Sequence, residues 1–175
     1  MMAAMQFRRA TVDDVPAVVA LVESAYRGAS SKVGWTTEAD ILGGQRTDPA
    51  DVRACIERDR SVVLLGEQDG ELVVCANVAV ENGAGYFGMF SVRPTLQGAG
   101  IGKRMIEECE RIAREEWQVA AMRMTVIDIR DELIAFYERR GYVRTGIKKP
   151  FPYGDPRFGL PKRDDLRFEV LEKRL

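Results

Sequence analysis

The sequence predicts a single mixed α/β domain over residues 1–175, with a mostly antiparallel, twisted sheet and flanking helices. The chain has 175 residues, the length of one ordinary domain. Asp69-Gly70 and Asn82-Gly83 separate three strand-like runs, and both dipeptides favour tight hairpin turns because they tolerate positive φ. The periodicities along the chain predict the order strand, two helices, three strands, helix, strand, helix and two strands.

The first third of the chain contains one expected strand, the two expected helices of this order and, between them, a short additional helix. The strand covers residues 6–10, and Thr11 is expected to cap the helix that follows. A short helix is expected at residues 35–40, capped by Thr36 or Thr37. Asp48 and Pro49 then favour a helix start, with that helix running to about residue 58.

The rest of the chain is expected to begin with an antiparallel meander. Its strands are residues 61–67, 71–80 and 86–92, and the nearly continuous apolar run at 73–80 predicts that the middle strand is central in the sheet. Later elements are the longest helix (98–117), a strand (121–127), a helix capped by Asp131 and ended by Gly141, a strand start (142–145), a loop (150–161) and a last strand (166–171).

Composition excludes several classes of function. The net charge is −1, which argues against binding to nucleic acid or to a membrane surface. No histidine is present, which removes Ser-His-Asp, Cys-His and His-zinc chemistry. The three cysteines, Cys55, Cys75 and Cys109, form no CxxC pattern, so we expect neither a disulfide framework nor a metal site. No signal peptide or membrane-spanning run is recognised, and we expect a cytoplasmic protein.

The glycine cluster at residues 97–103 is the segment most informative about chemistry. A strand ends, a turn follows, and a helix begins among Gly98, Gly100 and Gly102. Free N–H groups at a helix N-terminus and close backbone approach through glycine together make an anion site. A ligand-free tight turn is the competing interpretation. The spacing matches neither the dinucleotide pattern GxGxxG nor the P-loop pattern GxxxxGK[ST].

The segment resembles the pyrophosphate-binding Gln/Arg-x-x-Gly-x-Gly/Ala motif of the GNAT superfamily of acyl-CoA-dependent N-acetyltransferases. Gln97, Gly100 and Gly102 match its three defining positions, and residues 133–142 resemble the family's second motif. The resemblance covers nearly the whole chain. It implies a V-shaped splay between the fourth and fifth strands, acetyl-CoA as cosubstrate, and acetyl transfer to an amine on a small molecule or peptide. Family members are often homodimers.

The same resemblance implies roles for individual residues. Tyr137 matches the usual general acid, although an aromatic side chain packed in the core is the competing interpretation. The implied cofactor-binding residues are Phe90, Ser91 and Val92 along the pantetheine arm, the amides of Gln97, Gly98, Ala99, Gly100, Ile101, Gly102 and Lys103 at the pyrophosphate, and Phe136 beside the cofactor.

The general base and the acceptor pocket are less defined. Residues 84–93 contain no carboxylate, so the candidate bases are Glu38, Asp40, Glu81 and Asp128. Arg130 stands where many relatives have an asparagine that contacts the cofactor. In this family the segment at residues 26–40 often lines the acceptor pocket, which makes Trp35 and Glu38 the candidate substrate contacts. The loop at residues 150–161, with Phe151, Tyr153 and Phe158, is expected to cap the far side of that pocket.

Two functions besides acetyl transfer also fit these residues. A non-catalytic acyl-CoA-binding sensor would have the same cofactor motif without a base. A nucleotide-binding regulator would use the same helix N-terminus for a different phosphate group. Binding of CoA, ATP and NAD distinguishes the nucleotide-binding regulator from the two CoA-binding functions.

Overall fold

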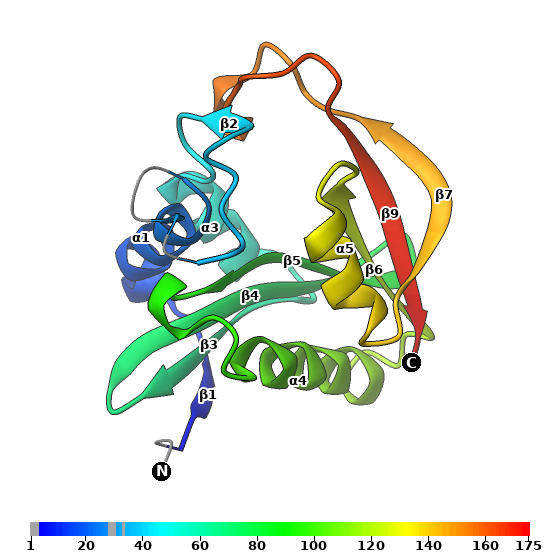
Figure 1. The fold of residues 1–175 in the computed structure, drawn as a ribbon. Coiled ribbons are helices and arrows are strands. Elements are labelled where there is room, and N and C mark those ends of the chain that lie inside the picture. Colours follow the sequence, from blue (N-terminus) through cyan, green and yellow to red (C-terminus); the bar gives the residue numbers. More distant parts are fainter. Residues whose placement is uncertain (1–3, 28–30, 33) are drawn as a thin grey trace.

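A seven-stranded sheet in the order β1-β3-β4-β5-β6-β9-β7 organises the fold in the computed structural model, which describes residues 4–27, 31–32 and 34–175. The strands are β1 (Gln6–Arg9), β3 (Ser61–Gln68), β4 (Glu71–Glu81), β5 (Ala84–Val92), β6 (Ala121–Ile127), β7 (Val143–Pro150) and β9 (Arg167–Arg174). All neighbours pair antiparallel except β5 and β6. The predicted mixed, mostly antiparallel sheet is confirmed (Figure 1).

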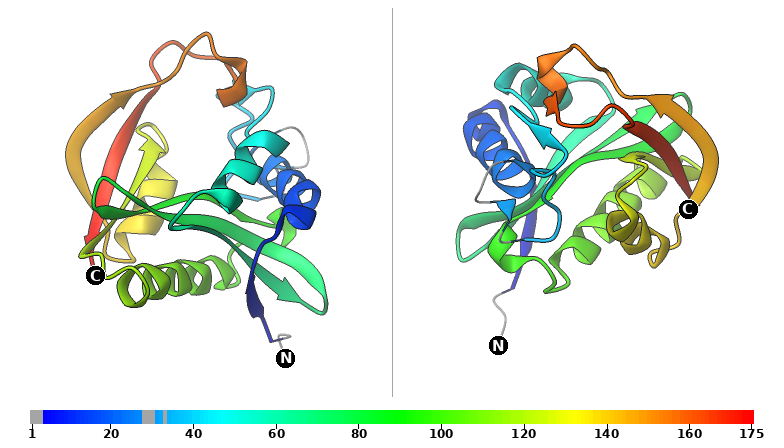
Figure 2. Two further views of the ribbon diagram at one scale, coloured as in Figure 1. Left: turned by 180° about the vertical axis from the view of Figure 1, so that it is seen from behind. Right: turned by 45° about the horizontal axis from the view of Figure 1, so that its top comes forward.

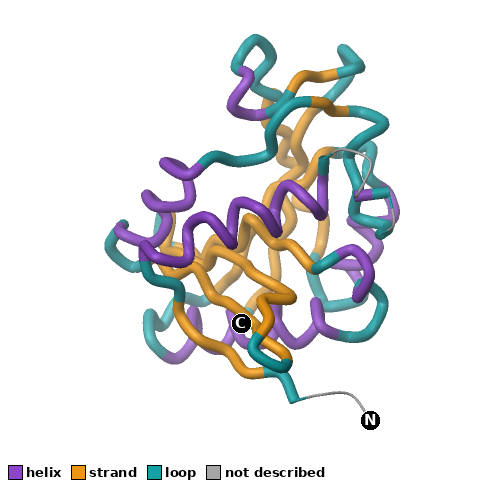
Figure 3. Tube along the Cα trace, turned by 90° about the vertical axis from the view of Figure 1, so that its left-hand side faces the viewer, coloured by secondary structure: helices purple, strands orange, loops and turns teal. Residues whose placement is uncertain are grey.

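Helices cover both faces of the sheet, as the view from behind in Figure 2 and the tube in Figure 3 show. The α-helices with described bounds are α1 (Val15–Tyr26), α3 (Pro49–Glu57), α4 (Ile101–Glu115) and α5 (Asp131–Glu138). Helices α1 and α3 pack with one apolar cluster, and α4 and α5 pack with the other.

Strand β4 is buried on both faces, which explains its unbroken apolar run. Val74 and Ala76 belong to the cluster on the α4 side, whereas Cys75 between them belongs to the cluster on the α1 side. Both neighbours of β4 are paired along most of its length. The prediction of a central strand is therefore confirmed.

Strands β5 and β6 diverge soon after they meet. Their parallel pairing is confined to Gly85 with Met122 and Tyr86 with Arg123, although β5 continues to Val92 and β6 to Ile127. This is the expected splay between the fourth and fifth strands of the predicted order. Figure 1 shows β9 and β7 rising on the far side of this opening.

The helix predicted at residues 35–40 is wrong. Residues 36–38 belong to no helix or strand, and a turn at residues 39–41 leads into β2 (Leu42–Gly43). Residues distant in sequence are the hydrogen-bond partners of this segment's backbone. Gln97 Oε1 accepts from the amide of Thr36 at 3.2 Å, and the Glu38 amide donates to the carbonyl of Tyr26 at 2.8 Å. Because tertiary partners take these groups, capping chemistry alone does not form a helix here.

The predicted loop at residues 150–161 contains structure that the sequence did not indicate. A short 3-10 helix (Pro156–Phe158) precedes β8 (Leu160–Pro161), and β8 pairs antiparallel with β2. Figure 1 shows this loop crossing above the opening to reach the segment that contains β2. The loop therefore connects the two halves of the molecule at that end.

Several element boundaries also differ from expectation. Helix α4 begins at Ile101 rather than at residue 98, because Gly98 and Gly100 have φ values of +90° and +80°. Asp131 lies inside the first turn of α5 and is not its cap, a place where a carboxylate still favours the helix dipole. Strand β7 begins at Val143, which confirms the strand start expected at residues 142–145, and it continues to Pro150. Among the described residues, no helix has the length and apolar character needed to cross a membrane.

Candidate functional site

The turn before α4 presents a row of unused backbone donors. Within the described chain, the amides of residues 98–103 donate to no acceptor, and the first helical bond joins the Arg104 amide to the Gly100 carbonyl at 3.3 Å. Gly100 is the N-cap of α4 in a left-handed conformation that only glycine adopts easily. The positive end of the helix dipole adds to these donors. The arrangement suits an anion.

The three glycines of the turn serve two purposes. A Cβ at Gly102 would lie 2.7 Å from Cζ of Phe90, so this glycine lets α4 pack closely on β5. A Cβ at Gly98 or Gly100 would meet no atom within 4 Å. These two glycines therefore leave open space beside the free amides.

The side chain of Gln97 ties two segments together. Its Oε1 accepts from the amides of Trp35 at 2.8 Å and Thr36 at 3.2 Å. Its Nε2 donates to Thr36 Oγ1 at 2.7 Å and to the carbonyl of Val92 at 3.0 Å. These four bonds use the whole side-chain amide. The backbone amide of Gln97 donates to the Pro94 carbonyl at 3.5 Å, so neither amide group of Gln97 is free to donate to a ligand, in contrast to the expectation from the sequence.

A cavity of about 440 Å³ lies against this turn. Its lining includes most of the expected cofactor residues: Phe90, Val92, Gln97, Gly98, Gly100, Gly102, Lys103 and Phe136. Ser91, Ala99 and Ile101 do not line it. The Ser91 hydroxyl donates to the Met89 carbonyl, and the Ile101 side chain is buried in the core, so these residues offer the cavity at most their backbone.

Two arginines that were not among the expected cofactor-binding residues also line this cavity. Arg139 and Arg140 follow Phe136 by three and four residues, which places all three on one face of α5 and its C-terminal turn. The guanidinium of Arg140 lies 3.7 Å from the centre of the Phe136 ring and donates to the Phe136 carbonyl at 2.7 Å. With Lys103, the lining has three cations against one carboxylate, Glu132, so positive charge is in excess. The spacing of the two arginines from Phe136 was the available sequence signal.

Strand β5 carries a bulge next to this cavity. Cys75 pairs with Ser91 and Asn77 with Gly88, so two residues of β5, Met89 and Phe90, oppose one residue of β4. Met89 adopts φ +55°, a strained value for a residue other than glycine. A bulge turns backbone groups out of the ladder and is common beside active sites.

A second cavity, of about 250 Å³, occupies the splay between β5 and β6. Phe90 lines both cavities, so they meet at the bulge. Residues of β5, β6, α5 and the 150–161 loop line this second cavity, among them Tyr86, Val126, Tyr137, Phe151 and Phe158. We call it the splay cavity, and the one at the glycine turn the turn cavity.

Tyr137 lies in an aromatic cluster and also lines the splay cavity. Its ring centre is 5.4 Å from that of Phe136 and 6.3 Å from that of Phe90. Burial is the main cause that raises the pKa of Tyr137 well above its ordinary value, with Tyr26 adding to it. The hydroxyl makes no hydrogen bond to any residue that the structure describes. It is therefore a protonated donor without a protein acceptor.

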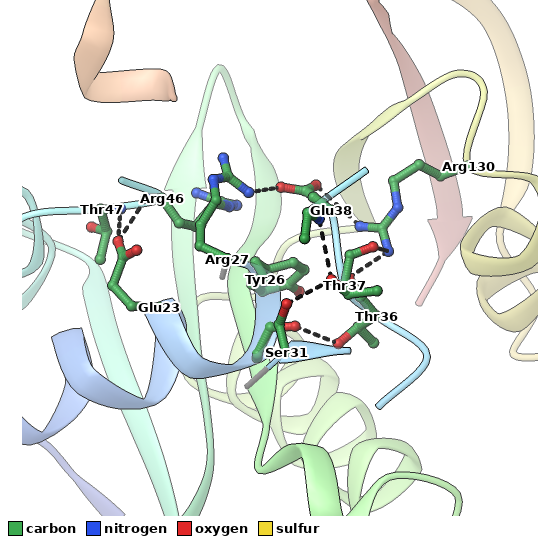
Figure 4. Close-up of polar contacts among 12 residues, drawn as sticks. Glu23, Tyr26, Arg27, Ser31, Thr36, Thr37, Glu38, Arg46, Thr47 and Arg130 are labelled. Carbon is green, nitrogen blue, oxygen red and sulfur yellow. Dashed lines mark hydrogen bonds and ion pairs between the residues drawn. The ribbon is translucent and has the colours of Figure 1, made fainter. Parts of the chain in front are cut away.

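Glu38 is buried and lies between arginines, as Figure 4 shows. It also lines the splay cavity. Oε1 pairs with Arg27, and Oε2 accepts from Arg130 Nη1 at 3.1 Å. Burial by itself would raise the pKa of Glu38, but the positive charges of Arg130, Arg46 and Arg27 outweigh it and lower the pKa. A carboxylate held in this way is a poor proton acceptor.

The remaining candidate bases lie away from the splay cavity. Asp40 is exposed and lies 3.6 Å from Lys32, and Glu81 lies 3.4 Å from Arg58. Asp128 pairs with Lys148 and Arg167. None of the three lines the cavity, so the structure offers no carboxylate base there among the described residues.

The expected acceptor-pocket residues do not all come together. Trp35 packs on Phe136 at 5.3 Å between ring centres and lines the turn cavity, so it is separated from Glu38. Phe151 and Phe158 line the splay cavity as expected, whereas Tyr153 hydrogen-bonds to the Leu166 amide instead. Of the segment at residues 26–40, residues 28–30 and 33 lie outside the described part of the chain.

The side chain of Arg130, the residue named as a departure from the family pattern, bonds to protein groups. Its Nη2 donates to the carbonyls of Thr36 and Thr37, and its Nη1 bonds Glu38. The side chain thus fixes the segment at residues 36–38 against α5. Arg46 was not identified from the sequence, and it lines the splay cavity too.

The described residues contain no group of three or more His, Cys, Asp and Glu side chains arranged to hold a metal ion. The candidate site therefore consists of backbone amides, three cations at the turn cavity, and the tyrosine and arginine side chains of the splay cavity.

Comparison with known proteins gives the class of protein. A sequence profile of the Acetyltransferase (GNAT) family matches residues 22–142, which is more than half of the chain, and the chain belongs to this family.

Individual relatives are more distant. An IAA acetyltransferase from Azospirillum brasilense is 33% identical over 97 residues, which cover 53% of this chain and 61% of that protein. A ribosomal-protein-alanine N-acetyltransferase from Brucella melitensis has a similar structure, with a TM-score of 0.71 and 23% identity over 97% of this chain and 99% of that one. An N-acetyltransferase from Staphylococcus aureus superposes with a TM-score of 0.71 at 11% identity, covering 98% of each chain. The structural likenesses at these identities show the fold alone.

Proposed function

We propose that this protein is an N-acetyltransferase that takes the acetyl group from acetyl-CoA and transfers it to a primary amine. The observation that carries the proposal is the row of free amides at residues 98–103 beside Lys103, Arg139 and Arg140. A diphosphate satisfies such donors, and the cations would favour its charge. The pantetheine arm would then run past Phe90 toward the splay cavity, which the family's use of acetyl-CoA supports.

The reaction proposed is direct attack on the thioester. The amine nitrogen forms a bond to the acetyl carbon, the bond from carbon to sulfur breaks, and the nitrogen loses one proton while the thiolate gains one. Backbone N–H groups between Phe90 and Val92, at the bulge of β5, are the proposed donors to the oxyanion. The proposed donor to the sulfur is Tyr137, whose raised pKa keeps the hydroxyl protonated.

The amine must be neutral when it attacks. For a lysine-like amine with a pKa of about 10.4, the neutral form costs about 4.6 kcal/mol at pH 7. Glu38 does not supply a base for this step, because its pKa is lowered by three arginines. The absence of a suitable carboxylate among the described residues favours the second candidate function, a non-catalytic acyl-CoA sensor.

The two functions differ in turnover. The experiment measures release of free CoA thiol from acetyl-CoA with a panel of amines, and calorimetric binding of CoA, ATP and NAD in parallel. We expect tight binding of CoA only, with amine-dependent thiol release. Tight CoA binding without release across the panel would favour the sensor, and preference for ATP or NAD would contradict both. We also propose a cytoplasmic location, for which the three unpaired cysteines are the support.

A further inference from the structure

The splay cavity carries an excess of positive charge. Its lining contains three arginines, Arg27, Arg46 and Arg130, against one carboxylate, Glu38. Both oxygens of Glu38 are already engaged by Arg27 and Arg130, so no free carboxylate oxygen faces the cavity from this residue. Figure 4 shows these two arginines reaching Glu38 from opposite sides. A second ammonium group on an acceptor would therefore meet positive charge without a partner.

Two donors in this lining have no acceptor. The Arg46 guanidinium lies 5.2 Å from the centre of the Tyr26 ring and makes no hydrogen bond or ion pair with the residues that the structure describes. Nε of Arg27 is buried without an acceptor, and the whole Arg27 side chain is only 5% exposed. Buried guanidinium donors are normally satisfied, since leaving them unpaired is unfavourable.

The position of Arg46 is itself fixed. Glu23 of α1 accepts from the amides of Arg46 at 2.6 Å and Thr47 at 2.8 Å through Oε1. The adjoining helix cap at Asp48 accepts from the Asp51 amide at 2.8 Å. The backbone that carries Arg46 is thus held on both sides, while its guanidinium lies over the Tyr26 ring and makes no hydrogen bond to a described residue.

We propose that the amine acceptor also carries a carboxylate, as a free amino acid does, and that Arg46 binds this carboxylate in the splay cavity. This inference rests on the proposed function. A planar guanidinium matches a carboxylate with two hydrogen bonds. The cavity volume of about 250 Å³ suits a small molecule, and Leu42, Phe151 and Phe158 offer apolar surface to its side chain.

The same charges have a consequence for the reaction. Nearby arginines disfavour the ammonium form of the bound amine, because like charges repel at short range. Loss of the amine proton is then easier without a carboxylate base. The three arginines, together with a glutamate that is already bonded to two of them, would therefore favour the neutral form of the proposed amine nucleophile.

The test compares amines that differ only in the carboxylate. Acetyl-CoA turnover is measured with L-leucine against isoamylamine, L-phenylalanine against phenethylamine, and spermidine as a polyamine. Because a hydrogen-bonded charge pair is lost, we expect kcat/KM to be at least about tenfold higher for the amino acid in one or both pairs. Higher kcat/KM for the decarboxylated amines or for spermidine would overturn the proposal.

Variants connect the preference to the cavity. Arg46→Gln should raise the KM for the amino acid by about tenfold or more and abolish the preference within the pair, while Arg46→Lys restores part of it. Arg53→Gln is the matched control, because Arg53 pairs with Glu57 on the exposed face of α3. The CoA dissociation constant and the melting temperature should be the same in all three variants as in the wild type. An unchanged preference in Arg46→Gln would overturn the assignment of the carboxylate site.

Failure of the proposed acetyl transfer can be distinguished from failure of the proposed carboxylate site. If CoA binds and no amine is acetylated, calorimetry with the same compound pairs on the CoA-bound protein tests the cavity alone. Binding of the amino acids that is lost in Arg46→Gln would support the carboxylate site even in a sensor. Binding of no carboxylate compound, or binding unaffected by Arg46→Gln, would overturn it.

Discussion

Gly100 offers a test in which backbone strain and ligand contact can be separated. Gly100 has φ +80° and open space around its missing Cβ, and Gly146 on β7 has φ +82° and the same open space. A left-handed conformation is unfavourable for alanine by about 1–2 kcal/mol. Alanine also lowers the entropy of the unfolded chain, which offsets about 0.4–1 kcal/mol of this cost. Gly100→Ala and Gly146→Ala should therefore each lower the free energy of unfolding by about 1 kcal/mol.

Only one of these variants should affect the cofactor. The added methyl at residue 100 projects beside the free amides of the turn cavity, whereas the one at residue 146 lies on the edge strand. Losing one charge-assisted hydrogen bond weakens binding by at least about tenfold. Calorimetry should show this loss of CoA affinity for Gly100→Ala and none for Gly146→Ala, with melting temperatures lowered alike by about 2–4 °C. Equal CoA affinity in the two variants would refute the role of the turn.

Further variants test the splay cavity and its supports. Tyr137→Phe should lower kcat by about 100-fold or more with little change in stability, since its hydroxyl has no protein partner among the described residues. Tyr142→Phe is the matched control, because the Tyr142 hydroxyl donates to Glu110 at 2.9 Å and the variant removes this hydrogen bond. Its free energy of unfolding should fall by about 1–3 kcal/mol, and its kcat should not change. The opposite pattern would contradict the general-acid assignment. Glu38→Gln should cost about 3–5 kcal/mol at pH 7, because it leaves its two arginine partners buried without a carboxylate.

The pH dependence of that last effect has a definite sign. The pKa of Glu38 is lower in the folded protein than in the unfolded chain, where it is about 4.3, so the carboxylate contributes fully above about pH 5. The contribution is lost as the pH falls through the lowered value. Denaturant titrations should show the wild-type advantage over Glu38→Gln shrinking below about pH 4. An advantage that grows on acidification would contradict the ion-pair geometry.

Local chemistry in the sequence was sufficient for most of the fold. The turns at Asp69-Gly70 and Asn82-Gly83 produced the meander because each needs positive φ at both residues, and both turns have it. The unbroken apolar run of β4 indicated burial on two faces. The helix expected at residues 35–40 failed because Gln97 and Tyr26, distant in sequence, take its backbone groups.

The candidate site shows the same division. The glycine spacing located the turn cavity, since φ and close approach are properties of single residues. The place of Arg46 could not be predicted, because the relation of Arg46 to Tyr26 and Glu38 exists only after α1 and the segment before β2 have packed together. Trp35 was expected at the acceptor pocket because the segment at residues 26–40 often lines it in this family, but its ring packs on Phe136 at the turn cavity instead.

The free amides before α4 are the proposed binding site for the diphosphate of CoA. The most direct measurement is the change in backbone amide resonances of Gly98, Gly100 and Gly102 during titration with CoA and, separately, with pantetheine, which has no phosphate. We predict saturable shifts of these resonances with CoA and none with pantetheine. If CoA bound while the resonances of these three amides did not shift, the diphosphate would lie elsewhere and the proposed binding site before α4 would be wrong.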